Sequence, residues 1–137
     1  MTKVYLGLGS NLGNREAHLR KAILLIGERV GQVMRQSSFI DTDPWGFQSS
    51  NRFMNAVVMI ETEHTAREVL EITQQIERDM GRQKKSVDGR YADRVIDIDI
   101  LLYGNEQVDE PDLKIPHPRM LERPFVMIPL GEISQND

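Results

Sequence analysis

The chain has 137 residues, of which 39% are apolar and 28% are charged, and its formal net charge is -4 at pH 7. This length suffices for one hydrophobic core and is short for two, so we expect a single domain over residues 1–137. Because the sequence contains no cysteine, disulfides, thiolate metal sites and a cysteine nucleophile are excluded. No apolar run reaches the roughly 18 residues of a membrane span, and the amino terminus lacks a signal-peptide pattern. We therefore expect a cytoplasmic protein that binds no membrane and, given its negative charge, no nucleic acid.

The first part of the chain predicts a strand that leads into a helix. Residues 3–9 alternate apolar side chains, as a strand does. Gly7 and Gly9 disfavour a strand, which indicates a close approach by backbone or by a ligand. Asn14 is suited to cap the following helix. Its apolar positions recur at helical spacing: Leu19, Ala22, Ile23, Ile26 and Val30.

The next part predicts two strands joined by a loop. We expect strands over residues 32–42 and 53–60, and the composition of residues 43–51 is that of a loop. Trp45 in this loop has two open interpretations, a cap on the core or part of a binding surface. Asn55 interrupts a strand that is otherwise apolar on both faces. Its buried amide must be satisfied by local groups or by a ligand.

Thr65 and Glu68 form a capping-box pattern that predicts the start of a second helix, ending near Gly81. Gln74 and Glu77 share one side of this helix, either as a solvated surface or as part of a site. A basic loop follows, and its cationic residues are Arg82, Lys84, Lys85, Arg90 and Arg94.

Residues 94–103 predict a fourth strand with two acids in an apolar run. Alternation places Asp97 and Asp99 on one face and an apolar row on the other: Ile96, Ile98, Ile100 and Leu102. The two carboxylates would stand about 6 to 7 Å apart at Cα, a spacing that suits one or two divalent cations facing a polyanion. The alternative is a half-exposed strand on which the two acids simply face solvent.

The remaining part of the chain predicts little regular structure. We expect a short strand at Gln107 and Val108, a proline-punctuated irregular segment over residues 109–118, and short helical turns over residues 119–130. His117 lies between two prolines, which fix its backbone and suit a positioned donor.

This order of elements, βαββαβ, predicts an α+β fold, a ferredoxin-like sandwich with an antiparallel sheet and both helices on one face. The other face would be left for chemistry or for a partner. Acids on that face oppose RNA binding unless metals intervene, and serine or cysteine hydrolase motifs are missing. Metal-assisted phosphoryl transfer is the class that the residues favour.

Several motifs in order along the chain resemble the 6-hydroxymethyl-7,8-dihydropterin pyrophosphokinase (HPPK) family of folate biosynthesis. They are Gly9 to Gly13, Asn55-Ala56, Gln74 and Glu77 before Gly81-Arg82, Arg94 to Leu101 with its two aspartates, and Pro116-His117 with Arg123 and Phe125. The resemblance implies transfer of the β,γ-pyrophosphoryl group of ATP to the pterin hydroxymethyl group, releasing AMP, with two Mg²⁺ ions.

The resemblance also implies roles for individual residues. Asp97 and Asp99 would hold both metals. The groups for phosphate and nucleotide would be Gln74, Glu77, Arg82, Lys84, Arg94, Ile98, His117 and Arg123. The pterin pocket would comprise Thr42, Trp45, Phe53, Asn55 and Phe125. A monomer or weak homodimer is expected, and two alternatives stay open: another two-metal nucleotide-dependent transferase, or a non-catalytic binding module.

Overall fold

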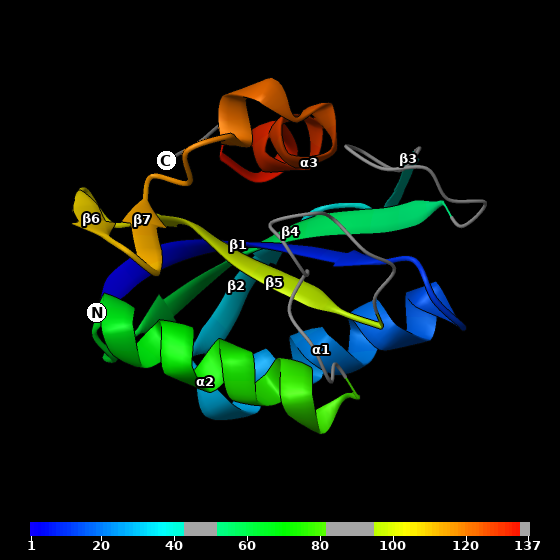
Figure 1. Ribbon diagram of the computed structural model, residues 1–137, viewed down its shortest axis with the longest axis horizontal. Helices are drawn as coiled ribbons and strands as arrows, with labels where there is room; N and C mark the ends of the chain where they lie inside the picture. Colours follow the sequence, from blue (N-terminus) through cyan, green and yellow to red (C-terminus); the bar gives the residue numbers. More distant parts are fainter. Residues whose placement is uncertain (43–51, 82–94, 135–137) are drawn as a thin grey trace.

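The computed structural model describes residues 1–42, 52–81 and 95–134, and one antiparallel sheet there lies between two helical layers (Figure 1). The strands are β1 (Thr2–Ser10), β2 (Gln32–Gln36), β3 (Ile40–Thr42), β4 (Phe53–Thr62), β5 (Asp97–Tyr103), β6 (Val108–Glu110) and β7 (Leu113–Ile115). The helices are α1 (Arg15–Arg29), α2 (Ala66–Asp79), the 3-10 turn η2 (Met120–Glu122) and α3 (Pro124–Ser134). Within these ranges no helix is long and apolar enough to cross a membrane.

The main sheet has the strand order β2-β4-β1-β5, and β3 also pairs with β4. Every pairing in it is antiparallel. Helix α1 follows β1 and helix α2 follows β4, and the strand order has β1 and β4 at the centre, which is the predicted ferredoxin-like arrangement. The prediction of fold class is confirmed.

Helices α1 and α2 cover one face of the sheet, as expected (Figure 1). The core between them includes the buried side chains of Leu6, Leu19, Ile76 and Ile98. Both predicted helix starts are also confirmed. The Asn14 side chain accepts a hydrogen bond from the backbone N–H of Ala17 at 3.1 Å. Thr65 and Glu68 form the reciprocal capping box of α2.

The opposite face is not left open along its whole length, which corrects the sequence prediction. Helix α3 packs on it above the sheet (Figure 1). Val57 and Met59 of β4 are buried against Val126 and Leu130 of α3. Because β4 is apolar on both faces, its second face also needs cover from water. The expected short turns over residues 119–130 are therefore a 3-10 turn and a full helix, with Pro124 as the first residue of that helix.

An irregularity in β5 corrects the predicted face of one residue. Ile98 and Ile100 face the α1–α2 core, as expected. The pairing of β1 with β5 shifts register between Tyr5 and Leu6, so Leu102 lies opposite Tyr5 and packs in the α3 layer. A β-bulge adds one residue to a strand, and simple alternation fails beyond it.

Two other strand predictions are wrong in detail. The strand expected over residues 32–42 is divided into β2 and β3. Between them Ser37 uses its hydroxyl oxygen to accept from the Val57 backbone N–H at 2.9 Å, in place of a ladder bond. The segment expected to be irregular after Asp109 instead completes a hairpin of β6 and β7, in which Asp109 pairs with Lys114.

Candidate active site

Three neighbouring strands align an amide, a glycine and a carboxylate in one row. In β1, Gly9 pairs with Asn55 of β4 on one side and with Asp97 of β5 on the other. Gly7, two residues earlier, pairs in the same way with Val57 and Asp99. Strands lie about 4.8 Å apart, so Asn55 and Asp97 are roughly 10 Å apart across Gly9. Asn55 and Asp97 therefore flank Gly9 on the same face of the sheet, and no side chain of β1 stands between them.

Gly9 is the tightest point of this row. A Cβ atom at Gly9 would lie 2.8 Å from Asn55 Oδ1 and 3.5 Å from Phe53 Cδ1. The close approach expected at this glycine is thus made by side chains of β4. Glycine is required here by packing, because any larger residue would displace the amide of Asn55.

The predicted pterin residues Thr42, Phe53 and Asn55 lie together at the β3–β4 pairing. Thr42 pairs with Phe53, and Asn55 donates from Nδ2 to Thr42 Oγ1 at 2.8 Å. Asn55 is only 6% exposed. The Thr42 hydroxyl therefore satisfies part of the hydrogen-bonding capacity of this amide, beside Gly9.

The two aspartates lie beside a buried cation. Asp97 and Asp99 are half-buried on the same face of β5, and Arg123 Nη1 lies 3.9 Å from Asp99 Oδ2. Arg123 is 5% exposed, and its guanidinium stands 5.6 Å from the centre of the Phe125 ring. Burial lowers the pKa of Arg123. The structure thus brings together Asp99, Arg123 and Phe125, which the sequence placed in one site.

The chemistry of the two aspartates fits Mg²⁺ that arrives with a nucleotide. Mg²⁺ is usually held by one or two carboxylates together with substrate phosphates and water. The described part of the chain contains no group of three or more His, Cys, Asp or Glu side chains able to hold a metal ion. We therefore expect the protein to supply a pair of carboxylates as Mg²⁺ ligands, and the nucleotide to supply phosphate oxygens as further ligands.

His117 is attached to β5 by its backbone. Its N–H donates to the carbonyl oxygen of Leu101 at 3.0 Å, and its Nδ1 accepts from the Arg119 N–H at 3.3 Å. With Nδ1 as acceptor, the hydrogen of the neutral ring belongs on Nε2, which is then a donor. Burial lowers the pKa of His117, while the charge of Asp97 opposes this shift. The ring is therefore positioned near Asp97, as a neutral donor at pH 7.

Glu77 has a structural contact that the sequence did not predict. Its Oε2 accepts from the backbone N–H of Ile98 at 2.7 Å, and the carboxylate is buried. Ile98 lies between the two aspartates, so Glu77 holds the outer edge of β5 at that point. Gln74 is half-buried on the same helix. The nucleotide role of both residues stays a prediction.

A pocket of about 250 Å³ lies beside the aspartates, along the edge of β5. Its walls come from α2, β5, the β6–β7 hairpin and the segment after it: Leu70, Ile98, Asp99, Ile100, Pro111, Asp112, Leu113, Lys114, His117 and Pro118. Ile98, Asp99 and His117 were expected in the site. The hairpin residues, Leu70 and Ile100 were not, although the alternation of Leu113 and Ile115 around Lys114 is a strand signal.

Four predicted site residues lie outside the described residues: Trp45, Arg82, Lys84 and Arg94. Their roles stay predictions from the sequence.

Comparison with known proteins gives a family match over nearly the whole chain. The model of the family described as 7,8-dihydro-6-hydroxymethylpterin-pyrophosphokinase (HPPK) matches residues 5–135. A relative in Porphyromonas gingivalis, named 2-amino-4-hydroxy-6-hydroxymethyldihydropteridine pyrophosphokinase, is 47% identical over 98% of this chain and 92% of its own. A protein of the same name in Bacillus subtilis is 43% identical over 96% of this chain and 77% of its own.

Solved structures agree at the level of the fold. A crystal structure of HPPK-DHPS in complex with substrates is similar with a TM-score of 0.77 and 14% identity. The match covers 96% of this chain and 40% of that longer chain. With its family match, its relatives and its fold in agreement, this chain belongs to the 7,8-dihydro-6-hydroxymethylpterin-pyrophosphokinase family.

Proposed function

We propose that the chain transfers the pyrophosphoryl group of ATP to 6-hydroxymethyl-7,8-dihydropterin, giving AMP and the pterin diphosphate for folate biosynthesis. The observation that supports this most is the row formed by Asn55, Gly9 and Asp97. It puts an amide able to read a heterocycle and a carboxylate able to face metal-bound phosphate at opposite ends of one row, on either side of Gly9. A hydroxymethyl group on a heterocycle held by Asn55 would point across Gly9 toward the acids.

The pterin end of this row would be formed by Asn55, Thr42 and the rings of Phe53 and Phe125. An amide carries both donors and an acceptor, which matches the alternating edge of a pterin. One N–H of Asn55 is donated to Thr42 at 2.8 Å, which leaves the second N–H and the Oδ1 atom for the heterocycle. The aromatic side chains would lie against the faces of the heterocycle. Trp45 would add to this pocket.

The phosphate end would be formed by Asp97 and Asp99. Two bound Mg²⁺ ions would neutralise the triphosphate and polarise the pterin hydroxyl. The two carboxylates would fix both ions on one face of β5, and Glu77 would hold that strand in place through Ile98. Arg82, Lys84 and Arg94 would add positive charge to the transferred group.

His117 and Arg123 would stabilise charge on the phosphate oxygens. The Nε2–H of His117 is oriented by the backbone contacts of that residue, so it is a preorganised donor. Arg123 is already positioned by burial near Asp99 and Phe125. Preorganised donors in a partly buried site stabilise developing charge more than mobile donors in water do. The cytoplasmic location and the monomeric or weakly dimeric state also stay predictions.

The reaction is tested by product analysis. The protein is incubated with ATP, Mg²⁺ and 6-hydroxymethyl-7,8-dihydropterin, with matched samples that lack the pterin or contain EDTA. We expect AMP and pterin diphosphate in equal amounts, and neither product in the two controls. ADP or free pyrophosphate as product would indicate another nucleotide-dependent transferase, and no turnover would indicate a binding module.

A further inference from the structure

The β6–β7 hairpin supplies one wall of the pocket without belonging to the main sheet. Its two strands pair with each other in a separate sheet. Four consecutive residues, Pro111 to Lys114, line the pocket that also contains Asp99. Leu113 and Ile115 anchor the base of the hairpin in the core. The tip of the hairpin, which contains Asp112, has a further attachment.

Arg67 of α2 makes that attachment. Its Nη1 donates to Asp112 Oδ2 at 2.7 Å and its Nη2 to Asp112 Oδ1 at 3.0 Å, and it also binds Glu110. The paired bonds to Asp112 are the two-pronged geometry that a guanidinium makes and an ammonium does not. Both partners belong to the hairpin, and Asp112 itself lines the pocket. One arginine therefore links the pocket wall to α2.

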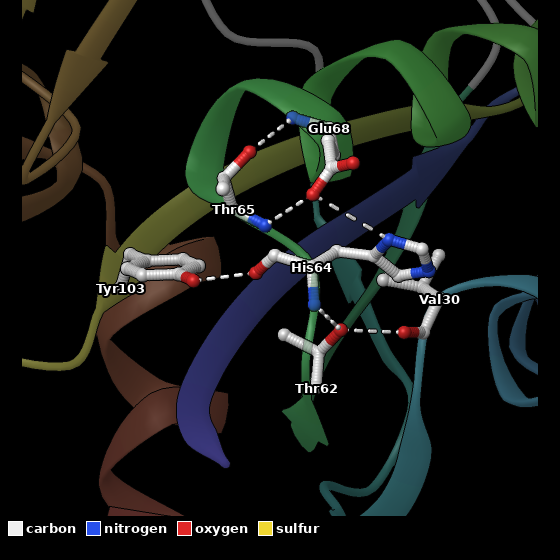
Figure 2. A network of polar contacts seen from close by, with 6 residues as sticks. All are labelled: Val30, Thr62, His64, Thr65, Glu68 and Tyr103. Carbon is white, nitrogen blue, oxygen red and sulfur yellow. Dashed lines mark hydrogen bonds and ion pairs between the residues drawn. The ribbon is translucent and has the colours of Figure 1, made fainter.

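Leu70, one turn after Arg67 on the same helix, also lines the pocket. The first turn of α2 is fixed by a network of polar contacts (Figure 2). The capping box of Thr65 and Glu68 closes this turn, and the Tyr103 hydroxyl donates to the His64 carbonyl, which ties it to the end of β5. The hairpin tip is thus attached to a helix turn that is itself held in place.

We propose that Arg67 is a positioning residue that sets the width of the pocket through Asp112 and Glu110, and thereby the affinity for the nucleotide co-substrate. This inference rests on the proposed function, in which the triphosphate binds at Asp99. Beyond Asp99 the pocket is lined mainly by apolar residues, and also by Asp112, Lys114 and His117, so it would receive the nucleoside part of the same molecule. Arg67 touches the wall from the helix side and acts on the nucleotide only through the hairpin.

The test compares three variants of the full chain. Arg67→Ala removes the attachment, and Arg67→Lys keeps the charge but cannot make both bonds to Asp112. Arg29→Ala is the matched control, because Arg29 forms an exposed pair with Asp79 that joins α1 to the other end of α2. For each we would measure the dissociation constant of a non-hydrolysable ATP analogue with Mg²⁺, the KM for each substrate, kcat and thermal unfolding.

We expect Arg67→Ala to weaken analogue binding and raise the KM for ATP by about three- to tenfold, as loss of an exposed ion-pair network would. In Arg67→Ala the KM for the pterin and kcat should change less than twofold. Arg67→Lys should have an analogue affinity and a KM for ATP between those of the wild type and Arg67→Ala. Arg29→Ala should match the wild type in all four quantities. Because exposed ion pairs are screened, the difference between Arg67→Ala and the wild type should shrink in high salt.

Unchanged analogue binding in Arg67→Ala would overturn the inference. So would an equal rise in both KM values together with a lower unfolding temperature, since that marks a general structural role. A wild type that binds no analogue and forms no AMP would instead contradict the proposed function.

Discussion

Asn55 and Asp97 lie on opposite sides of Gly9, each as its direct partner in a neighbouring strand. This relationship connects two parts of the site that are 42 positions apart in the sequence. Antiparallel pairing fixes register, so neither residue can move along its strand without shifting a whole row of side chains. The separation between the Asn55 amide and the two acids is therefore set by the sheet.

The first prediction concerns the glycine in this row. In Gly9→Ala the new Cβ would lie 2.8 Å from Asn55 Oδ1, so the amide must move away from Thr42. We expect the KM for the pterin to rise about tenfold, equal to about 1.4 kcal/mol, with a smaller change for ATP. Steady-state kinetics with each substrate varied in turn would measure this.

Gly7→Ala is the matched control for that substitution. It lies on the same strand and face, and its added Cβ would make an ordinary contact with Leu101 Cδ2 at 3.4 Å. Wild-type pterin affinity in Gly9→Ala would show that Asn55 does not need its present position.

The second prediction concerns Glu77. Glu77→Ala leaves the buried N–H of Ile98 without its acceptor at 2.7 Å. An unsatisfied buried donor costs about 1–3 kcal/mol, and the free energy of unfolding should fall by that amount in urea titrations. Glu71→Ala, on the exposed side of the same helix, is the control and should be within about 0.5 kcal/mol of the wild type. Equal stability of the two variants would mean that the carboxylate does not support β5.

The third prediction concerns the attachment of α3 to the sheet. Glu132 accepts hydrogen bonds from the Ser38 hydroxyl at 2.6 Å and from its backbone N–H at 2.9 Å, and these bonds lower the pKa of Glu132 below its usual 4.5. A lowered folded-state pKa gives stability that is present above pH 4.5 and is lost as pH falls through the folded value. Ser38→Ala removes one bond and should raise this pKa toward 4.5.

An NMR titration of the Glu132 carboxyl carbon would measure the pKa of Glu132 in the wild type and in Ser38→Ala. The stability difference between wild type and Ser38→Ala should be present at pH 7 and should narrow at pH 3. A pKa that is the same in the two proteins would show that the Ser38 hydroxyl does not hold the carboxylate in solution.

Local patterns in the sequence predicted most of the fold. The caps at Asn14 and Thr65 depend on hydrogen bonds to residues three positions away, and both are confirmed. The bulge that turns Leu102 to the α3 face could not be predicted, since it arises from pairing between β1 and β5. The hairpin wall was missed for a related reason. Prolines on either side of β7 suggested irregular chain, although an isolated hairpin tolerates them at its ends.

The candidate site was predictable where a residue did not fit the pattern of the strand that contains it. Asn55 in an apolar strand, Gly9 inside a strand and the acids of β5 each conflicted with their surroundings, and the structure brings them into one row. Ile100 and Leu70 gave no such signal, because apolar residues in a strand or helix fit the core equally well. Their place in the pocket wall depends on tertiary packing.

The metal assignment of Asp97 and Asp99 is the centre of the proposed function. Binding of Mn²⁺ to the complex with a non-hydrolysable ATP analogue, followed by electron paramagnetic resonance, tests it most directly. We predict two ions for each wild-type chain and for Asp79→Asn, an exposed acid of α2 that serves as the control. Asp97→Asn, with its fold verified by circular dichroism, should bind Mn²⁺ at least about tenfold more weakly, a loss of about 1.4 kcal/mol. Two ions bound to Asp97→Asn with wild-type affinity would contradict the account.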